Sequence, residues 1–92
     1  MRYEWDDAKN EANRRKHGIA FRDAIPALID PARVEWIDNR FDYGEERVCA
    51  LGLATGNVLF VVHVLRDEET CRIISARRAL KHEQERYFRG DP

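Results

Sequence analysis

The sequence lacks the features that define several large classes of protein. No apolar run reaches the roughly 18 residues of a membrane span, and the N-terminus, MRYEWDDAKN, carries acidic residues where a signal peptide would be apolar. The only two cysteines, Cys49 and Cys71, lie in apolar runs without CxxC spacing, which favours buried, reduced thiols. We therefore expect a soluble cytoplasmic protein that makes no contact with a membrane.

The motifs of metal-dependent and nucleotide-hydrolysing enzymes are missing too. The chain has no Gly-rich phosphate loop, no GxSxG and no HExxH. Its histidines, His17, His63 and His82, have no ligand spacing, and no histidine lies near a cysteine. We expect neither a metal nor a cofactor. His63 interrupts an apolar strand and is interpreted as a hydrogen-bonded core histidine.

Charge is present in quantity but is unevenly distributed. The 92 residues contain 16 Lys+Arg and 17 Asp+Glu, and 43% of them are hydrophobic, as expected for one folded domain spanning residues 1–92. Residues 19–46 hold three cations against seven acids, whereas residues 71–89 hold six cations against two acids. The basic part could bind a polyanion and the acidic part a basic partner; the alternative is two ordinary solvated surfaces.

The pattern of apolar residues predicts an α+β fold. A first helix runs from Asp6 or Asp7 through Lys16 and ends at Gly18. A second helix covers residues 22–29, and Pro26 is tolerable if it lies in the first turn, which would move the start of that helix later. Strands are predicted at residues 33–38, 47–54, 58–65 and 70–75, with residues 2–5 as a short edge strand and a C-terminal helix over residues 76–88.

Cationic side chains gather where the last strand meets the last helix. Arg72 and Arg77 suit phosphate oxygens, Arg47 is expected opposite them, and Lys16 and His17 are expected from the first helix. RNA can be cleaved without metal by a base, an acid and cations that stabilise the charged phosphorane. On chemistry alone this signal is weak. The alternative is structural: the last helix is a solvated surface helix, and Asn13 of the first helix satisfies backbone groups.

Motifs along nearly the whole chain resemble the BrnT family of type II toxins. The matching residues are Glu4-Trp5-Asp6, Lys9, Asn13, Lys16-His17-Gly18-Ile19, Phe21, Asp30-Pro31, Glu45-Glu46-Arg47, Gly52, Arg72-Ile73-Ile74-Ser75-Ala76-Arg77, Glu83, Arg86 and Tyr87. The resemblance implies a compact RelE-like fold with two N-terminal helices, an antiparallel sheet of about four strands and a C-terminal helix. It also implies a ribonuclease that halts translation.

The resemblance further implies an antitoxin partner of the BrnA type. Such antitoxins carry a ribbon-helix-helix part, so operator DNA would be contacted only through the antitoxin. The assembly is left open between a homodimer and a hetero-oligomer with the antitoxin. The alternative functions are a non-catalytic nucleic-acid-binding module and an inactive toxin kept as a corepressor.

Roles for individual residues follow from the matching positions and their chemistry. We expect acid–base work from His17 and Glu46, charge stabilisation from Lys16, and phosphate binding from Arg72 and Arg77. Arg77 is expected in the first turn of the last helix, where a cation opposes the helix dipole. The remaining RNA-binding candidates are Lys9, Arg47, Arg78, Lys81, Arg86 and Tyr87.

Overall fold

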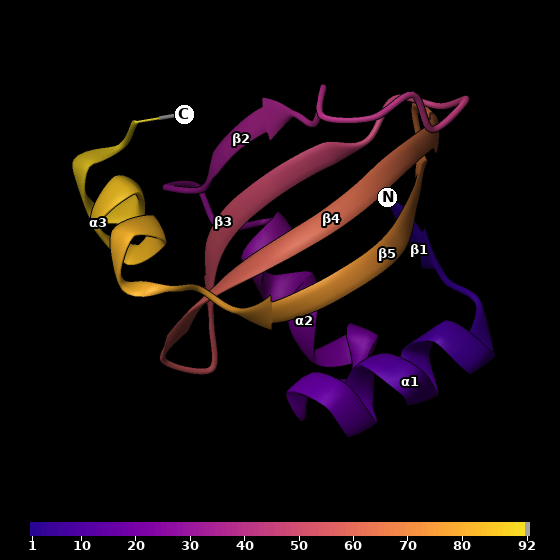
Figure 1. The fold of residues 1–92 in the computed structure, drawn as a ribbon, viewed down its shortest axis with the longest axis horizontal. Helices are drawn as coiled ribbons and strands as arrows, with labels where there is room; N and C mark the ends of the chain where they lie inside the picture. The colour runs from indigo at the N-terminus through magenta and orange to yellow at the C-terminus, as the bar shows by residue number, and fades with distance from the viewer. Residues whose placement is uncertain (92) are drawn as a thin grey trace.

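The computed structural model describes residues 1–91 and shows one sheet with helices on both faces (Figure 1). In chain order the elements are β1 (Arg2–Glu4), α1 (Asp7–His17), α2 (Phe21–Leu28), β2 (Val34–Ile37), β3 (Val48–Ala54), β4 (Asn57–Asp67), β5 (Thr70–Arg78) and α3 (Lys81–Arg89). The strand order is β1-β5-β4-β3-β2. The α+β class, the two N-terminal helices and the C-terminal helix are therefore confirmed.

The sheet differs from the expected one at its β1 edge. It has five strands, and β1 pairs with β5 in parallel, with Arg2 opposite Thr70 and Glu4 opposite Arg72. The remaining pairings are antiparallel. A three-residue strand carries too little hydrophobic pattern to be predicted with its direction. Because β1 ends opposite Arg72, the rest of β5 has no strand on that side within residues 1–91.

The ends of α1 follow from its sequence. The Asp6 carboxylate accepts a hydrogen bond from the Lys9 amide at 3.0 Å, as an N-cap does. Gly18 ends the helix with φ of 74°, and its amide donates to the Arg14 carbonyl. A left-handed residue at this place favours glycine, so both predicted ends are confirmed.

The interpretation of Pro26 was wrong. The helix α2 starts at Phe21, so Pro26 is its sixth residue and not part of the first turn. Proline removes the amide that would bond to the carbonyl four residues earlier, here that of Arg22. Both residues are exposed, so water can satisfy this carbonyl, and the helix continues to Leu28.

The junction between β5 and α3 also lies later than predicted. The strand continues through Arg77 and Arg78, which pair with Phe60 and Leu59 of β4. The Ala79 amide then donates to the Val58 carbonyl at 2.9 Å, and α3 begins only at Lys81. Arg77 is therefore a strand residue, and the expected conflict between its charge and the helix dipole does not exist.

Two hydrophobic clusters occupy the two faces of the sheet. One includes Phe21, Ala24, Ala27, Val61 and Ile73, where α2 packs on the sheet. The other joins α3 to the opposite face, and its buried members are Val34, Leu51, Val58, Ala79 and Tyr87. Both cysteines are free and buried, as predicted. Within residues 1–91, no helix is both long enough and apolar enough to cross a membrane.

Helix α2 lies directly on β3 at Gly52. A Cβ atom there would overlap the Ala27 carbonyl oxygen and lie 2.7 Å from the carbonyl carbon. We expect Gly52→Ala to lower the free energy of unfolding by about 3 kcal/mol, because rigid backbone must move apart. Urea unfolding measures this change.

Gly44→Ala is the control for this substitution. Gly44 has φ of 71° but open space around it, so only backbone strain of about 1–2 kcal/mol is expected. Equal losses in the two variants would show that the contact between α2 and β3 is not tight.

Candidate functional site

The face of the sheet that packs against α3 carries the larger group of candidate residues. Trp36 of β2 pairs with Cys49 of β3, and Phe60 of β4 pairs with Arg77 of β5. Directly paired residues share a face of an antiparallel sheet. We call this surface the arginine face and define it by Trp36, Arg47, Phe60, Arg72, Arg77 and Arg86.

Arg77 is held on this face from two directions. Its Nη1 and Nη2 atoms donate to the two Glu83 carboxylate oxygens at 2.8 and 3.0 Å. Its guanidinium carbon lies 4.3 Å from the centroid of the Phe60 ring. The side chain is 30% exposed, whereas that of Glu83 is 8% exposed. The cation is therefore positioned in advance with one side open to solvent.

Glu83 is ionised in this arrangement. Burial alone would raise the pKa of its carboxyl group, but hydrogen bonds from Arg77 and the Leu80 amide, with the charge of Arg77, lower that pKa overall. The same carboxylate thus orients Arg77. It also accepts a hydrogen bond of 2.8 Å from the Leu80 amide at the start of α3. Glu83 is a structural partner of the cation.

Two more arginines stack on aromatic rings. The guanidinium carbon of Arg86 lies 4.1 Å from the Trp36 ring centroid, and that of Arg47 lies 4.0 Å from the centroid of Tyr43. Trp36 and Phe60 lie 5.7 Å apart, centroid to centroid. Arginine stacked on aromatic rings keeps its charge while its planar face is sheltered. This combination suits nucleic acid, which offers both phosphates and bases.

Arg72 lies on the arginine face but away from Arg77. It pairs with Val64, whereas Arg77 pairs with Phe60. Their partners on β4 are four residues apart, which corresponds to about 13 Å at the usual rise. The two guanidinium groups therefore do not form one compact cluster.

The other group of candidates lies at the edge of β5 that β1 leaves open. Asn13 of α1 is buried there, and its amide nitrogen donates to the Ala76 carbonyl at 2.8 Å. The Ala76 amide donates back to the Asn13 side-chain oxygen at 3.1 Å. Asn13 therefore replaces the missing neighbouring strand, as the interpretation of a backbone-satisfying residue predicted.

This contact brings the end of α1 to the end of β5. His17, the last residue of α1, is half-buried. Partial burial, followed by the charges of Lys16 and Arg77, lowers the pKa of His17 below 6.5. His17 is therefore neutral near pH 7 and can accept a proton. Lys16 beside it is exposed.

Glu46 lies far from His17. It lines a surface hollow with Val64 and Arg66 at one end of β4, whereas Gly18, next to His17, lines a cavity with Leu59 at the other end. Five residues of strand correspond to about 16 Å. The structure therefore does not bring together the two residues expected to share acid–base work.

The other RNA-binding candidates are scattered. Lys9, Arg78 and Lys81 are exposed, on α1, β5 and α3 respectively. Tyr87 is only 9% exposed, and its hydroxyl donates to Asp30. This position packs α3 against the sheet and leaves Tyr87 little surface for RNA.

Much of the acidic stretch is neutralised internally. The buried Asp38 carboxylate accepts hydrogen bonds from Arg40 and Tyr43, and those from Arg40 above all lower the pKa of Asp38 to about 2. Glu45 lies 3.6 Å from Arg47. Glu45, one of two adjacent acids, is thereby held by an arginine.

His63 is buried, as predicted. Its Nε2 atom lies 3.8 Å from Glu35, and its Nδ1 atom has no hydrogen-bond partner among the described residues. Burial lowers the pKa of His63 despite the charge of Glu35. Residues 1–91 contain no group of three or more His, Cys, Asp or Glu placed to hold a metal ion.

Sequence reasoning missed the aromatic part of the site. Trp36 and Phe60 lie in predicted strands and were not among the candidate residues. The sequence offered one signal: each of two predicted strands carries a large aromatic residue, and charged residues were expected on the same face of the sheet. Recognising it needed the pairing of Phe60 with Arg77, which only the register gives.

Comparison with known proteins now assigns the chain to a class. Residues 5–83 match the profile of the family described as "Ribonuclease toxin, BrnT, of type II toxin-antitoxin system". Because this match covers most of the chain, the protein belongs to the BrnT family of ribonuclease toxins.

A solved structure supports this assignment. The crystal structure of the Brucella abortus ribonuclease toxin BrnT superposes with a TM-score of 0.65 at 25% sequence identity, covering 88% of this chain and 99% of that one. No curated protein sequence matches the chain significantly.

The Asn13–Ala76 contact gives a testable expectation. Asn13→Ala leaves the buried amide and carbonyl of Ala76 without partners, so we expect the free energy of unfolding to fall by about 3 kcal/mol. Hydrogen exchange of the Ala76 amide should accelerate. Asn10→Ala is the matched control on the same helix, because Asn10 accepts only one bond, from the Phe21 amide. An unchanged exchange rate at Ala76 in Asn13→Ala would contradict this account of the edge.

Proposed function

We propose that this protein is a metal-independent endoribonuclease that halts translation and is silenced by a BrnA-type antitoxin. The observation that carries the proposal is the position of Arg77. It is fixed by Glu83 and Phe60, is partly open to solvent, and is close enough to His17 to lower the pKa of that residue. A fixed cation whose charge acts on a neutral imidazole supplies two of the parts that RNA cleavage needs.

The proposed chemistry is attack of the ribose 2′-oxygen on the adjacent phosphate. His17 takes the 2′-OH proton, the 2′-oxygen bonds to phosphorus, and the bond to the 5′-oxygen breaks. The departing oxygen takes a proton from solvent, so the products are a 2′,3′-cyclic phosphate and a 5′-hydroxyl. Arg77, with Lys16, stabilises the negative charge that builds up on the phosphate oxygens.

The remaining candidates extend the binding surface. Arg72 and Arg86 lie on the arginine face and would bind neighbouring phosphates, and Trp36 offers a ring for base stacking. Arg47 and Glu46 lie toward the other end of β4. Glu46 takes no part at the cleaved bond in this proposal, because its separation from His17 prevents both from acting on one phosphate.

The antitoxin is proposed to cover the arginine face and the adjoining end of α1. An acidic segment placed there would block RNA and pair with partly desolvated arginines, which are frequent hot spots of binding energy. The internal pairing of Asp38 and Glu45 leaves the acidic stretch fewer free charges for this contact. Operator DNA would be reached only through the antitoxin.

A corepressor without activity is the second candidate, and variants of the Arg77–Glu83 pair decide between the two. Replacing Arg77 alone would bury an unpaired Glu83 carboxylate, so the test uses Arg77→Gln with Glu83→Gln. We expect this double variant to remain folded and to lose about 100-fold or more in RNA cleavage, the scale for removal of a charge-stabilising group.

Two single variants control this comparison. Glu83→Gln retains the Arg77 charge and should keep most of the cleavage. Arg89→Ala removes an exposed arginine that pairs with Asp91 and should cleave as the unchanged protein does. A folded double variant with full activity would exclude the proposed role of Arg77, and no cleavage by the unchanged protein would favour the corepressor.

The lowered pKa of His17 predicts the pH dependence of cleavage. A base must be unprotonated, so the rate should fall with decreasing pH through a midpoint below 6.5. His17→Gln should lose this limb together with most of the activity. Lys16→Gln removes a charge that lowers the pKa, so its midpoint should move to higher pH. A limb that stays in place in both variants would show that another group titrates.

A further inference from the structure

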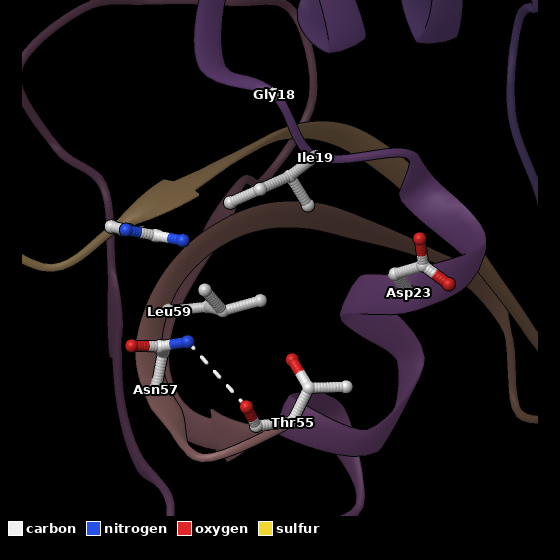
Figure 2. Close-up of a pocket in the computed structure, with 7 residues that line it drawn as sticks. Gly18, Ile19, Asp23, Thr55, Asn57 and Leu59 are labelled. Carbon is white, nitrogen blue, oxygen red and sulfur yellow. Dashed lines mark hydrogen bonds between the residues drawn. The ribbon is translucent and has the colours of Figure 1, made fainter.

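A cavity of about 290 Å³ opens at the junction of α1, α2 and the β3–β4 turn. Gly18 and Ile19 border it from the end of α1, Asp23 from α2, and Leu59 and Arg78 from the sheet. In Figure 2 Ile19 and Leu59 form its apolar interior, with Asp23 on one side and Asn57 on the other. The cavity lies on the opposite face of the sheet from Arg77.

Within the part of the chain that the structure describes, the two charged side chains of this cavity have no charged or hydrogen-bonding partners. Within residues 1–91, neither the Asp23 carboxylate nor the Arg78 guanidinium takes part in an ion pair within 4.0 Å. Neither group makes a side-chain hydrogen bond there, since only the Arg78 carbonyl is used, by Arg77. The two carboxylate oxygens of Asp23 can therefore accept hydrogen bonds from a ligand, and the guanidinium of Arg78 can donate them. Apolar side chains line the space between the two groups.

We propose that this cavity binds a guanine base of single-stranded RNA. Guanine presents two adjacent donors, N1–H and N2–H, which match the two oxygens of a carboxylate such as Asp23. It also presents the acceptors O6 and N7, which match the fork of an arginine such as Arg78. Ile19 and Leu59 provide the apolar surface on which the base lies.

The other bases match less of this arrangement. Adenine and cytosine offer a single exocyclic amine to a carboxylate, and uracil offers one ring N–H. A phosphate is disfavoured because Asp23 would repel it. Unpaired bases of RNA are the ones whose Watson–Crick and Hoogsteen edges a protein can read, and guanine satisfies both charged groups.

The position of the cavity links it to the proposed cleavage chemistry. Gly18 directly follows His17, and Arg78 directly follows Arg77, so two residues that border the cavity are the sequence neighbours of the two residues that would act on the phosphate. This inference rests on the proposed function. Together they imply that the enzyme cleaves RNA next to guanine. Arg77 binds the phosphate from one face of β5 while Arg78 binds the base from the other.

The first experiment measures binding, which does not depend on cleavage. Guanosine, inosine and adenosine 5′-monophosphates are titrated into the protein, and amide shifts of Gly18, Thr55 and Asn57 are followed by NMR. We expect guanosine monophosphate to bind about tenfold or more tightly than the other two, since only guanosine can make both hydrogen bonds to the carboxylate. Inosine lacks the N2 amine and tests the carboxylate contact.

The matched variant is Asp23→Asn, and Glu85→Gln is the control at another exposed acid. Asp23→Asn should remove the preference for guanosine over inosine, whereas Glu85→Gln should keep it. Equal binding of the three nucleotides, or a guanosine preference that survives in Asp23→Asn, would overturn the assignment of this cavity.

The second experiment measures cleavage of RNA oligonucleotides that carry one guanine at varied positions. Cleavage next to guanine that becomes indifferent to the base in Asp23→Asn supports the inference. Cleavage that ignores the base in the unchanged protein overturns it and leaves the ribonuclease proposal standing. Asp23-dependent guanosine binding without any cleavage supports the cavity and overturns the ribonuclease proposal.

Discussion

The pair of hydrogen bonds between Asn13 and the Ala76 backbone sets the geometry of the whole candidate site. β1 ends opposite Arg72, so the second half of β5 would expose unpaired amides and carbonyls. A buried side-chain amide from α1 satisfies this edge instead. Because unsatisfied buried backbone groups are costly, α1 is held at one position, and His17 and Gly18 at its end are held with it.

The second determinant is the alternation of β5. Arg77 and Arg78 are neighbours in sequence, yet a strand points them to opposite faces. Arg77 meets Glu83 and Phe60 beneath α3, whereas Arg78 faces the cavity beside α1 and α2. A shift in register between Val62 and His63 precedes this segment, so the irregularity lies upstream of both arginines. Two adjacent cations thereby serve two surfaces.

The fold class, the caps of α1 and the buried cysteines could be predicted because each depends on local residues. Asp6 and Gly18 mark the helix ends, and the alternation of apolar residues marks the strands. The end of β5 could not be predicted, because Ala76-Arg77-Arg78 suits a helix equally well and is held extended by its pairing with Leu59 and Phe60. The distance between His17 and Glu46 likewise follows from tertiary placement. The residue types identified the cationic candidates, but the sequence did not show which face of the sheet each of them occupies.

The two tryptophans lie on opposite sides of this sheet. Trp5 packs edge-on against Phe21 at a centroid distance of 6.2 Å on the side of α1 and α2, whereas Trp36 lies under Arg86 on the arginine face. Their fluorescence therefore originates from two separate environments. When one tryptophan at a time is substituted, the fluorescence of the other reports binding or conformational change on its own face of the sheet. No attached dye is needed.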